Sequence, residues 1–213
     1  MTRVAEMFSP RATRQLARLL GRLPYRLRLS VWGQAGDPFV QQLREVAAGL
    51  CRARAQDLVW EWREDGGPPR LEVSYASGEP TGLSFYGSVA GYQFQGLLGG
   101  LREAGRTKPI QVERVGRILV FSTPTCPECS RILRAAQRWA LAGRRFEVVG
   151  VDASAVPSWA ERFGVEVVPT TVVIHAGGTA VLAGALPLRQ WQLWVEQALR
   201  GAEGESGGAD YRD

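Results

Sequence analysis

Two cysteines separated by two residues, Cys126 and Cys129, are the side chains of this sequence best suited to chemistry. They follow an apolar run at 118–121 that is typical of a buried strand, and they precede apolar residues at helical spacing. A cysteine at a helix N-terminus lies beside unpaired amide N–H groups, which stabilise its thiolate. The spacing therefore predicts thiol–disulfide exchange, in which Cys126 attacks a substrate disulfide and Cys129 resolves the mixed disulfide.

The two residues between the cysteines are predicted to lie against the substrate. Pro127 falls in the first helical turn, where its missing N–H costs least. Glu128 adds a negative charge beside the thiols, which opposes formation of the Cys126 thiolate. We therefore expect a pair that is less oxidising than the strongest disulfide-forming enzymes.

A single Cys-x-x-Cys motif is also half of a zinc site, which would need two further ligands. The chain offers one histidine, His175, and one other cysteine, Cys51, and neither is spaced to complete a site. We expect no metal and no bound cofactor, and zinc binding remains the weaker alternative. Cys51 is instead predicted to be a small buried apolar residue, and His175 a solvated residue at the shoulder of a hairpin.

Charge and hydropathy argue against nucleic-acid and membrane functions. The net charge is +5, and seven arginines lie between Arg3 and Arg28. Arg14, Arg18 and Arg22 are spaced by four, as on the solvated face of a helix, and no aromatic residues interleave with them for base stacking. No apolar run approaches the roughly 20 residues of a membrane span, and the N-terminus lacks the apolar core of a secretory signal. We therefore expect a cytoplasmic protein.

The predicted elements repeat in the same order. A helix after Ser9 opens the chain, and the first half then has a strand, a helix, a strand, a hairpin and a helix, at 27–31, 38–50, 58–62, 71–85 and 92–102. The second half repeats this order from residue 118 and adds a short helix at 157–163. In the first half only residues 63–68 fill that connection, which is too short for a helix. The repeat predicts an α/β fold with two domains, at 1–108 and 109–200, and a disordered Gly/Ser/Glu-rich tail at 201–213.

A second motif, Val168-Pro169-Thr170, strengthens the redox interpretation. The segment with the dithiol, ILVFSTPTCPEC, and the segment with this motif, PSWAERFGVEVVPTTVVI, resemble the active site and the cis-proline strand of the thioredoxin/glutaredoxin family. The whole chain resembles the tandem-domain protein disulfide oxidoreductases of thermophilic prokaryotes. This resemblance implies two thioredoxin-like domains, each with a mixed central sheet flanked by helices. It also implies a cis-Pro169 facing the dithiol, with Val168 and Thr170 beside a bound peptide.

The chain departs from this family in its first half. Residues 33–37 stand where a second Cys-x-x-Cys motif belongs, so this half is expected to be redox-inactive. In lacking this motif, the first half resembles the N-terminal domain of the flavoprotein subunit of alkyl hydroperoxide reductase. Pro69 would match the cis-proline of this half, with Pro68 as the competing choice. Thioredoxins carry a buried aspartate in the strand before the dithiol, and Asp152 is the nearest candidate here. The short connection at 105–116 predicts that the helix expected before the second domain is absent.

Three functions of different class follow. The first is a thiol–disulfide oxidoreductase that acts on protein disulfides in the cytosol and receives electrons from a flavoprotein resembling thioredoxin reductase. The second is a dedicated electron-transfer adaptor between such a flavoprotein and a peroxiredoxin. The third is a binding or metal module without redox activity. The Cys-x-x-Cys motif at a helix start favours the first.

Overall fold

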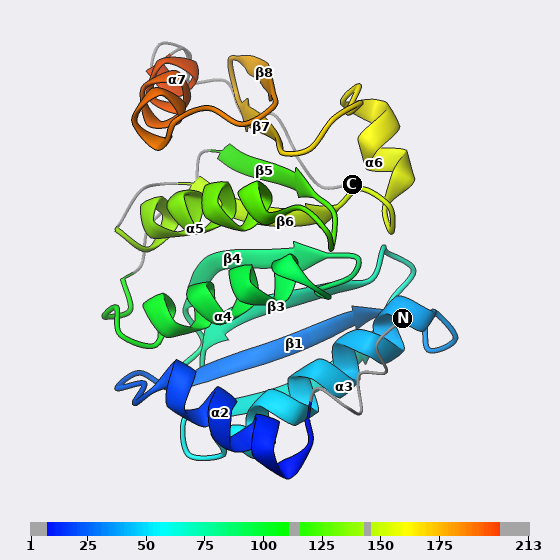
Figure 1. The fold of residues 1–213 in the computed structure, drawn as a ribbon, viewed down its shortest axis with the longest axis vertical. Helices are drawn as coiled ribbons and strands as arrows, with labels where there is room; N and C mark the ends of the chain where they lie inside the picture. The colour runs from blue at the N-terminus through cyan, green and yellow to red at the C-terminus, as the bar shows by residue number, and fades with distance from the viewer. Residues whose placement is uncertain (1–7, 111–115, 143–145, 201–213) are drawn as a thin grey trace.

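The computed structural model describes residues 8–110, 116–142 and 146–200. Within these ranges the predicted elements form in the predicted order (Figure 1). The first half of the chain consists of α2 (Pro10–Leu20), β1 (Leu27–Gly33), α3 (Pro38–Ala53), β2 (Leu58–Glu64), β3 (Arg70–Tyr75), β4 (Pro80–Tyr86) and α4 (Tyr92–Ala104). The second half consists of β5 (Gly116–Ser122), α5 (Pro127–Leu141), β6 (Phe146–Asp152), α6 (Pro157–Arg162), β7 (Thr170–His175), β8 (Gly178–Ala183) and α7 (Leu188–Arg200).

All eight strands join in one mixed sheet with the order β2-β1-β3-β4-β6-β5-β7-β8. Each half contributes four strands in the same order, in which the second strand comes first and the first, third and fourth strands follow. The second strand of the first half, β2, is an edge strand, and that of the second half, β6, lies at the junction of the halves. The halves meet where β4 pairs in parallel with β6, from Leu83 opposite Val148 to Tyr86 opposite Val151. The predicted α/β fold with a repeated mixed sheet is confirmed, and the edge-to-edge union of the two sheets is an added finding.

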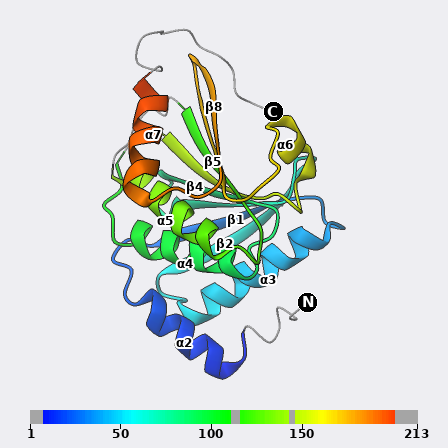
Figure 2. The same cartoon turned by 45° about the horizontal axis from the view of Figure 1, so that its top comes forward.

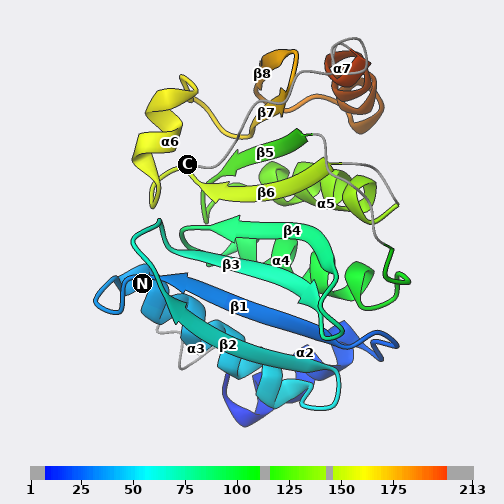
Figure 3. The same ribbon diagram turned by 180° about the vertical axis from the view of Figure 1, so that it is seen from behind.

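Helices α2, α3, α4, α5 and α7 contribute to the core on one face of the sheet, and α6 packs on the other face beside the second half. Figure 3 shows the first half from the side without helices, where β1, β2 and β3 lie open. The connection after β2 holds no helix, as its length predicted. Side chains cover this face instead, because the guanidinium groups of Arg63 and Arg70 lie 5.3 and 5.1 Å from the ring centroid of Trp32.

His175 corrects one prediction, because its side chain is 5% exposed rather than solvated. It ends β7, which lies inside the sheet between β5 and β8, and it shares a face with Thr171. Helix α7 covers that face, where the indole N–H of Trp191 donates to Thr171 Oγ1 at 2.9 Å. His175 Nδ1 accepts the Gly177 N–H at 3.0 Å. The hairpin pattern could not reveal this cover, since α7 arrives from later in the chain.

Two further predictions concern the connection between the two halves and the C-terminal tail. Residues 105–110 hold no helix, while 111–115 and the predicted disordered tail at 201–213 lie outside the described residues. No helix among the described residues is long and apolar enough to cross a membrane.

Candidate dithiol site

Cys126 and Cys129 are joined in a disulfide at the start of α5, with their Cα atoms 5.4 Å apart. Cys126 is the N-cap of this helix, and its Sγ accepts the Cys129 N–H at 3.2 Å. Cys126 is partly exposed, whereas Cys129 is 1% exposed. A substrate disulfide can therefore reach the first sulfur and not the second, which is the asymmetry that attack followed by resolution requires.

The local sequence explains why the helix begins at this point. The buried strand β5 ends at Ser122, and a turn follows in which the Cys126 N–H donates to the Thr123 carbonyl at 3.2 Å. Pro127 then occupies the first helical position, where its fixed backbone angle suits the helix and no N–H is missed. The thiol of Cys126 thus lies at the positive end of the helix dipole, which favours its ionised form once the disulfide is reduced.

Glu128 is exposed and does not act as an isolated charge. Its carboxylate forms an ion pair with Arg131 one turn later, at 2.6 Å. The guanidinium of Arg131 also donates to the Leu186 carbonyl at 3.2 Å. The neighbouring positive charge offsets the field of Glu128 at the thiols, so its effect on the dithiol is smaller than the sequence alone indicates.

The Val168–Pro169 peptide bond is cis. Thr170, the next residue, pairs with Phe121 across β7 and β5, which places Pro169 at the end of the sheet where β5 leads into the dithiol loop. Thr170 itself is buried, and its hydroxyl donates to the Val167 carbonyl at 2.7 Å. Val168 is partly exposed at this end. The structure therefore brings Val168, Pro169 and Thr170 to the same end of the sheet as the cysteines.

In the first half, Pro69 takes the corresponding place before β3, but its peptide bond is not cis. Among the described residues the cis geometry occurs at Val168–Pro169 alone, so the predicted cis bond at Pro69, or at Pro68, is wrong. The position is nevertheless equivalent, because the Pro69 carbonyl accepts the Gly87 N–H at 2.7 Å and the Pro169 carbonyl accepts the Gly184 N–H at 2.8 Å. Trans is the ordinary state of such a bond, and the local sequence does not determine the isomer.

Asp152, the candidate proton acceptor, is 1% exposed and ends β6 directly opposite Ser122. Its Oδ1 accepts from the backbone N–H and the hydroxyl of Ser154, at 3.0 and 2.6 Å. Its Oδ2 has no hydrogen-bond partner among the described residues. The carboxyl group thus lies at the strand end beside the dithiol loop, and a role in proton transfer stays a prediction.

Cys51 lies on α3 in the first half and packs against the apolar core, as predicted, but it is partly exposed rather than fully buried. Burial raises the pKa of its thiol to about 12, and the charge of Arg26 only partly opposes this. No cluster of three or more potential metal ligands occurs among the described residues.

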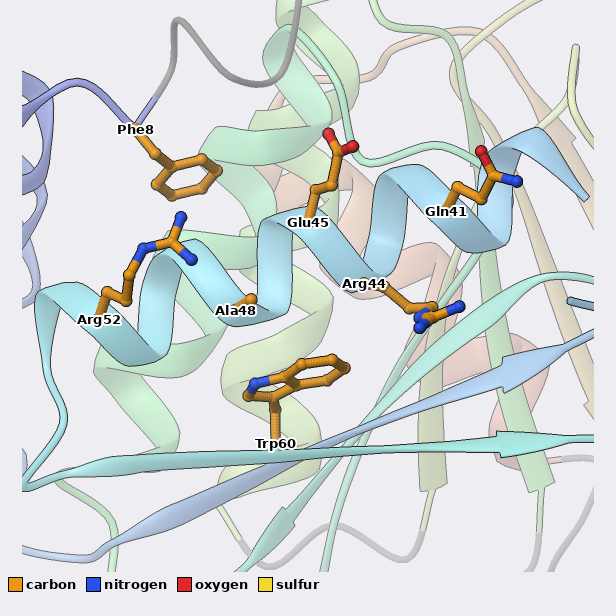
Figure 4. Close-up of a pocket in the computed structure, with 7 residues that line it drawn as sticks. All are labelled: Phe8, Gln41, Arg44, Glu45, Ala48, Arg52 and Trp60. Carbon is orange, nitrogen blue, oxygen red and sulfur yellow. The ribbon is translucent and has the colours of Figure 1, made fainter.

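A pocket of about 550 Å³ lies away from the dithiol, over α3 and β2 in the first half. Figure 4 shows its lining side chains, which come from α3, β2 and the segment before α2: Phe8, Gln41, Arg44, Glu45, Ala48, Arg52 and Trp60. None of them is a thiol or lies on an element that carries the dithiol. We therefore do not assign this pocket to the redox site.

The structure also adds residues that sequence reasoning missed. Gln93 of α4 donates through Nε2 to Ser122 Oγ at 2.8 Å, and the Tyr92 N–H donates to the Pro124 carbonyl at 2.9 Å. One signal was present in the sequence, because Gln93 is a polar residue in helical register with the buried Leu97, Gly100 and Leu101. Nothing in the sequence indicated its partner.

Comparisons with known proteins show which solved structures share this fold. No protein-family model matches the sequence, and no curated protein sequence matches it either. Among solved structures, the NTD_N/C domain of alkylhydroperoxide reductase AhpF from Enterococcus faecalis superposes with a TM-score of 0.75 at 20% identity, covering 90% of this chain and 99% of that one. The chain has the tandem thioredoxin fold.

A second neighbour supports the same fold. It is a protein disulfide oxidoreductase from Aeropyrum pernix, with a TM-score of 0.71 at 15% identity over 94% of this chain and 96% of that one. Both neighbours are thus matched along nearly their whole length, and both halves of this chain take part in the match. The tandem thioredoxin fold explains why the strand order repeats and why the dithiol lies at the start of a helix.

Proposed function

We propose that this protein is a thiol–disulfide oxidoreductase that exchanges the Cys126–Cys129 pair with disulfides of cytosolic proteins. The observation that carries the proposal is the disulfide at the helix N-terminus, with Cys126 partly exposed and Cys129 buried. The division into a redox-inactive domain at 1–108 and an active domain at 109–200 is part of the same proposal.

In the proposed reaction the Cys126 thiolate attacks one sulfur of a substrate disulfide. A mixed disulfide forms, and the other substrate sulfur leaves as a thiolate that takes up a proton. The Cys129 thiolate then attacks Cys126 Sγ, which closes the intramolecular disulfide and releases the second substrate thiol. Two electrons have passed to the substrate, and a dithiol reductant, for which we propose a flavoprotein of the thioredoxin-reductase type, must restore the pair.

Val168, Pro169 and Thr170 would hold the substrate segment during this reaction. Val168 lies partly exposed just before β7 begins, where its backbone can form hydrogen bonds with an extended peptide. Pro127 and Glu128 are exposed next to Cys126 and would contact the same segment.

The test is the reduction of insulin disulfides with dithiothreitol as electron donor, together with the potential of the pair in glutathione buffers. We expect clear acceleration over dithiothreitol alone and a potential nearer about −270 mV, the thioredoxin value, than about −120 mV. Absence of acceleration would contradict general exchange with protein disulfides. A potential above roughly −150 mV would indicate a disulfide-forming enzyme instead.

The likeness in fold to the AhpF domain favours one second candidate, an electron-transfer adaptor between a flavoprotein and a peroxiredoxin. An adaptor should turn over insulin poorly and pass electrons rapidly to its one partner. Comparing the two substrates at equal protein concentration separates the two functions.

A further inference from the structure

The start of α4, in the half without a dithiol, touches the loop that carries Cys126. The Tyr92 N–H donates to the Pro124 carbonyl at 2.9 Å, two residues before Cys126. The preceding residue is glycine, with φ +56°, and a Cβ atom at Gly91 would lie 2.1 Å from the Pro124 carbonyl oxygen. Only glycine therefore permits this approach of the two backbones.

Gln93 fixes the beginning of the same loop. Its side chain is 5% exposed, and its Nε2 donates to Ser122 Oγ at 2.8 Å. The Ser122 hydroxyl in turn donates to the Val151 carbonyl at 3.2 Å. A buried chain of hydrogen bonds thus joins α4, the last residue of β5 and the end of β6, next to the loop that leads into the dithiol helix.

The rest of α4 holds the dithiol helix itself. Helices α4 and α5 lie side by side in both Figure 1 and Figure 2. Three glycines on α4, Gly96, Gly99 and Gly100, face α5, and a Cβ atom there would lie 2.7, 2.9 and 3.0 Å from its side chains. The two helices are therefore close-packed, and Gln93 lies one turn before Gly96 on the same side of α4.

We propose that Gln93 is a positioning residue for the dithiol, contributed by the half that has lost its own. This inference rests on the proposed function, because it concerns the rate of the same exchange. Gln93 fixes the position of Ser122 where β5 ends. The loop from Ser122 to Cys126 is therefore held in one conformation, in which the Cys126 thiolate is aligned with the S–S bond of a substrate disulfide. Attack on a disulfide is sensitive to such alignment, and a loop fixed at one end only would sample unproductive geometries.

The test compares Gln93→Leu with the matched control Gln95→Leu, which lies on the exposed face of the same helix. Both are made in a Cys51→Ala background, so that only the dithiol reacts. The probe is dithiodipyridine, a small disulfide that needs no docking surface, mixed with the reduced protein by stopped flow. We expect Gln93→Leu to react about fivefold more slowly, the effect of roughly one lost hydrogen bond, and Gln95→Leu to react at the parent rate.

The reduction potential gives a second readout, which separates positioning from a change in stability. The proposal needs these bonds in the dithiol form as well as in the disulfide form, so Gln93→Leu should slow the attack and leave the potential of the pair unchanged. A shift in potential that matches the loss of rate would mean that the bonds act on the relative stability of the two redox forms, and would overturn the positioning role. Urea unfolding of every variant verifies that the compared proteins are folded.

A double-mutant cycle with Ser122→Ala identifies the bond itself. Ser122→Ala removes the bond from Gln93 and also the bond to the Val151 carbonyl, so the double variant should lose no more rate than Ser122→Ala alone. Additive losses, or equal rates for Gln93→Leu and Gln95→Leu, would overturn the positioning role. Should the unchanged protein fail to reduce insulin, the proposed function is wrong, and that result is independent of this comparison.

Discussion

The loop at 33–37 and the loop at 122–126 are the same structural element with different chemistry. Each follows a strand of seven residues, ends in an N-cap and is followed by proline at the first helical position. In the first half the cap is Asp37, whose Oδ1 accepts the N–H groups of Phe39 and Val40 at 2.7 and 3.3 Å. In the second half it is Cys126, whose Sγ accepts the Cys129 N–H.

Burial matches as well. Asp37 and Cys126 are partly exposed, whereas Val40 and Cys129, three residues later, are buried. The fold therefore needs an acceptor at the cap and a small apolar side chain on the inner face of the first turn. A thiol meets both needs, but so do a carboxylate and a valine. The comparison shows how one half could lose the dithiol and keep its architecture.

The largest expected effect comes from removing the thiols. Cys126→Ser should abolish disulfide reduction, because a hydroxyl does not attack disulfides at neutral pH. Cys129→Ser should instead accumulate mixed disulfides with substrate proteins, since attack survives and resolution fails. Insulin turnover and non-reducing gels measure the two outcomes. Near-normal turnover by Cys126→Ser would mean that the nucleophile is elsewhere.

Next in size is the reverse experiment, which installs cysteines at the loop of residues 33–37. The double variant Asp37→Cys, Val40→Cys should close a second disulfide, because both positions match the dithiol helix in capping and burial. Thiols are counted in denaturant without reductant, with the unchanged protein as control. In the unchanged protein, which has three cysteines, only Cys51 should titrate. In the variant the two added cysteines should be joined in the second disulfide, so it should also show one thiol. A count of three would show that the two loops are not equivalent.

A smaller effect concerns the cap itself. Asp37→Ala removes the acceptor for two backbone N–H groups and should lower the free energy of unfolding by about 1 kcal/mol. Asp37→Asn keeps a side-chain oxygen at the cap and should cost less. Urea unfolding measures both variants. Their exchange rates should stay at the parent value, and a loss of rate would mean that this loop also takes part in catalysis.

Glu128→Gln should change the dithiol only slightly. The substitution removes a negative charge near Cys126, but Arg131 already offsets that charge and the site faces solvent. We expect a pair more oxidising by less than about 10 mV, measured in glutathione buffers. Glu147→Gln, which breaks an ion pair with Arg117 in the sheet, is the matched control. A shift of about 30 mV or more would show that the ion pair does not screen Glu128.

The smallest effect is expected at Cys51. With its pKa raised to about 12, only about one thiol in ten thousand is ionised at pH 8, so labelling by iodoacetamide should be far slower than that of reduced Cys126. Cys51→Ala should leave the exchange rate unchanged. Because the folded-state pKa lies above the ordinary value of 9.0, the thiol's contribution to stability is full below about pH 9 and is lost as the pH rises toward 12. Rapid labelling at neutral pH would contradict the burial.

The sequence by itself determined the local features of this protein. Alternation in β1 and β3, helical spacing in α3 and α5, and prolines at the helix starts predicted the element order. The Cys126–Cys129 spacing after a buried strand predicted the helix-start disulfide, and the short link after β2 predicted the missing helix. These features depend on neighbours a few residues apart, so periodicity and spacing report them directly.

Only the tertiary structure decided what depends on distant segments. The pairing of β4 with β6, the bond from Gln93 to Ser122 and the bond from Trp191 of α7 to Thr171 of β7 each join residues from separate elements. A side chain's pattern shows that it is buried or polar, but not which partner meets it. The four-stranded sheet of each half has edges that could remain unpaired or could pair with the other half. The local sequence does not distinguish these two arrangements. For that reason the sequence located the dithiol, while the structure showed which residues of the first half contact the loop that leads to it.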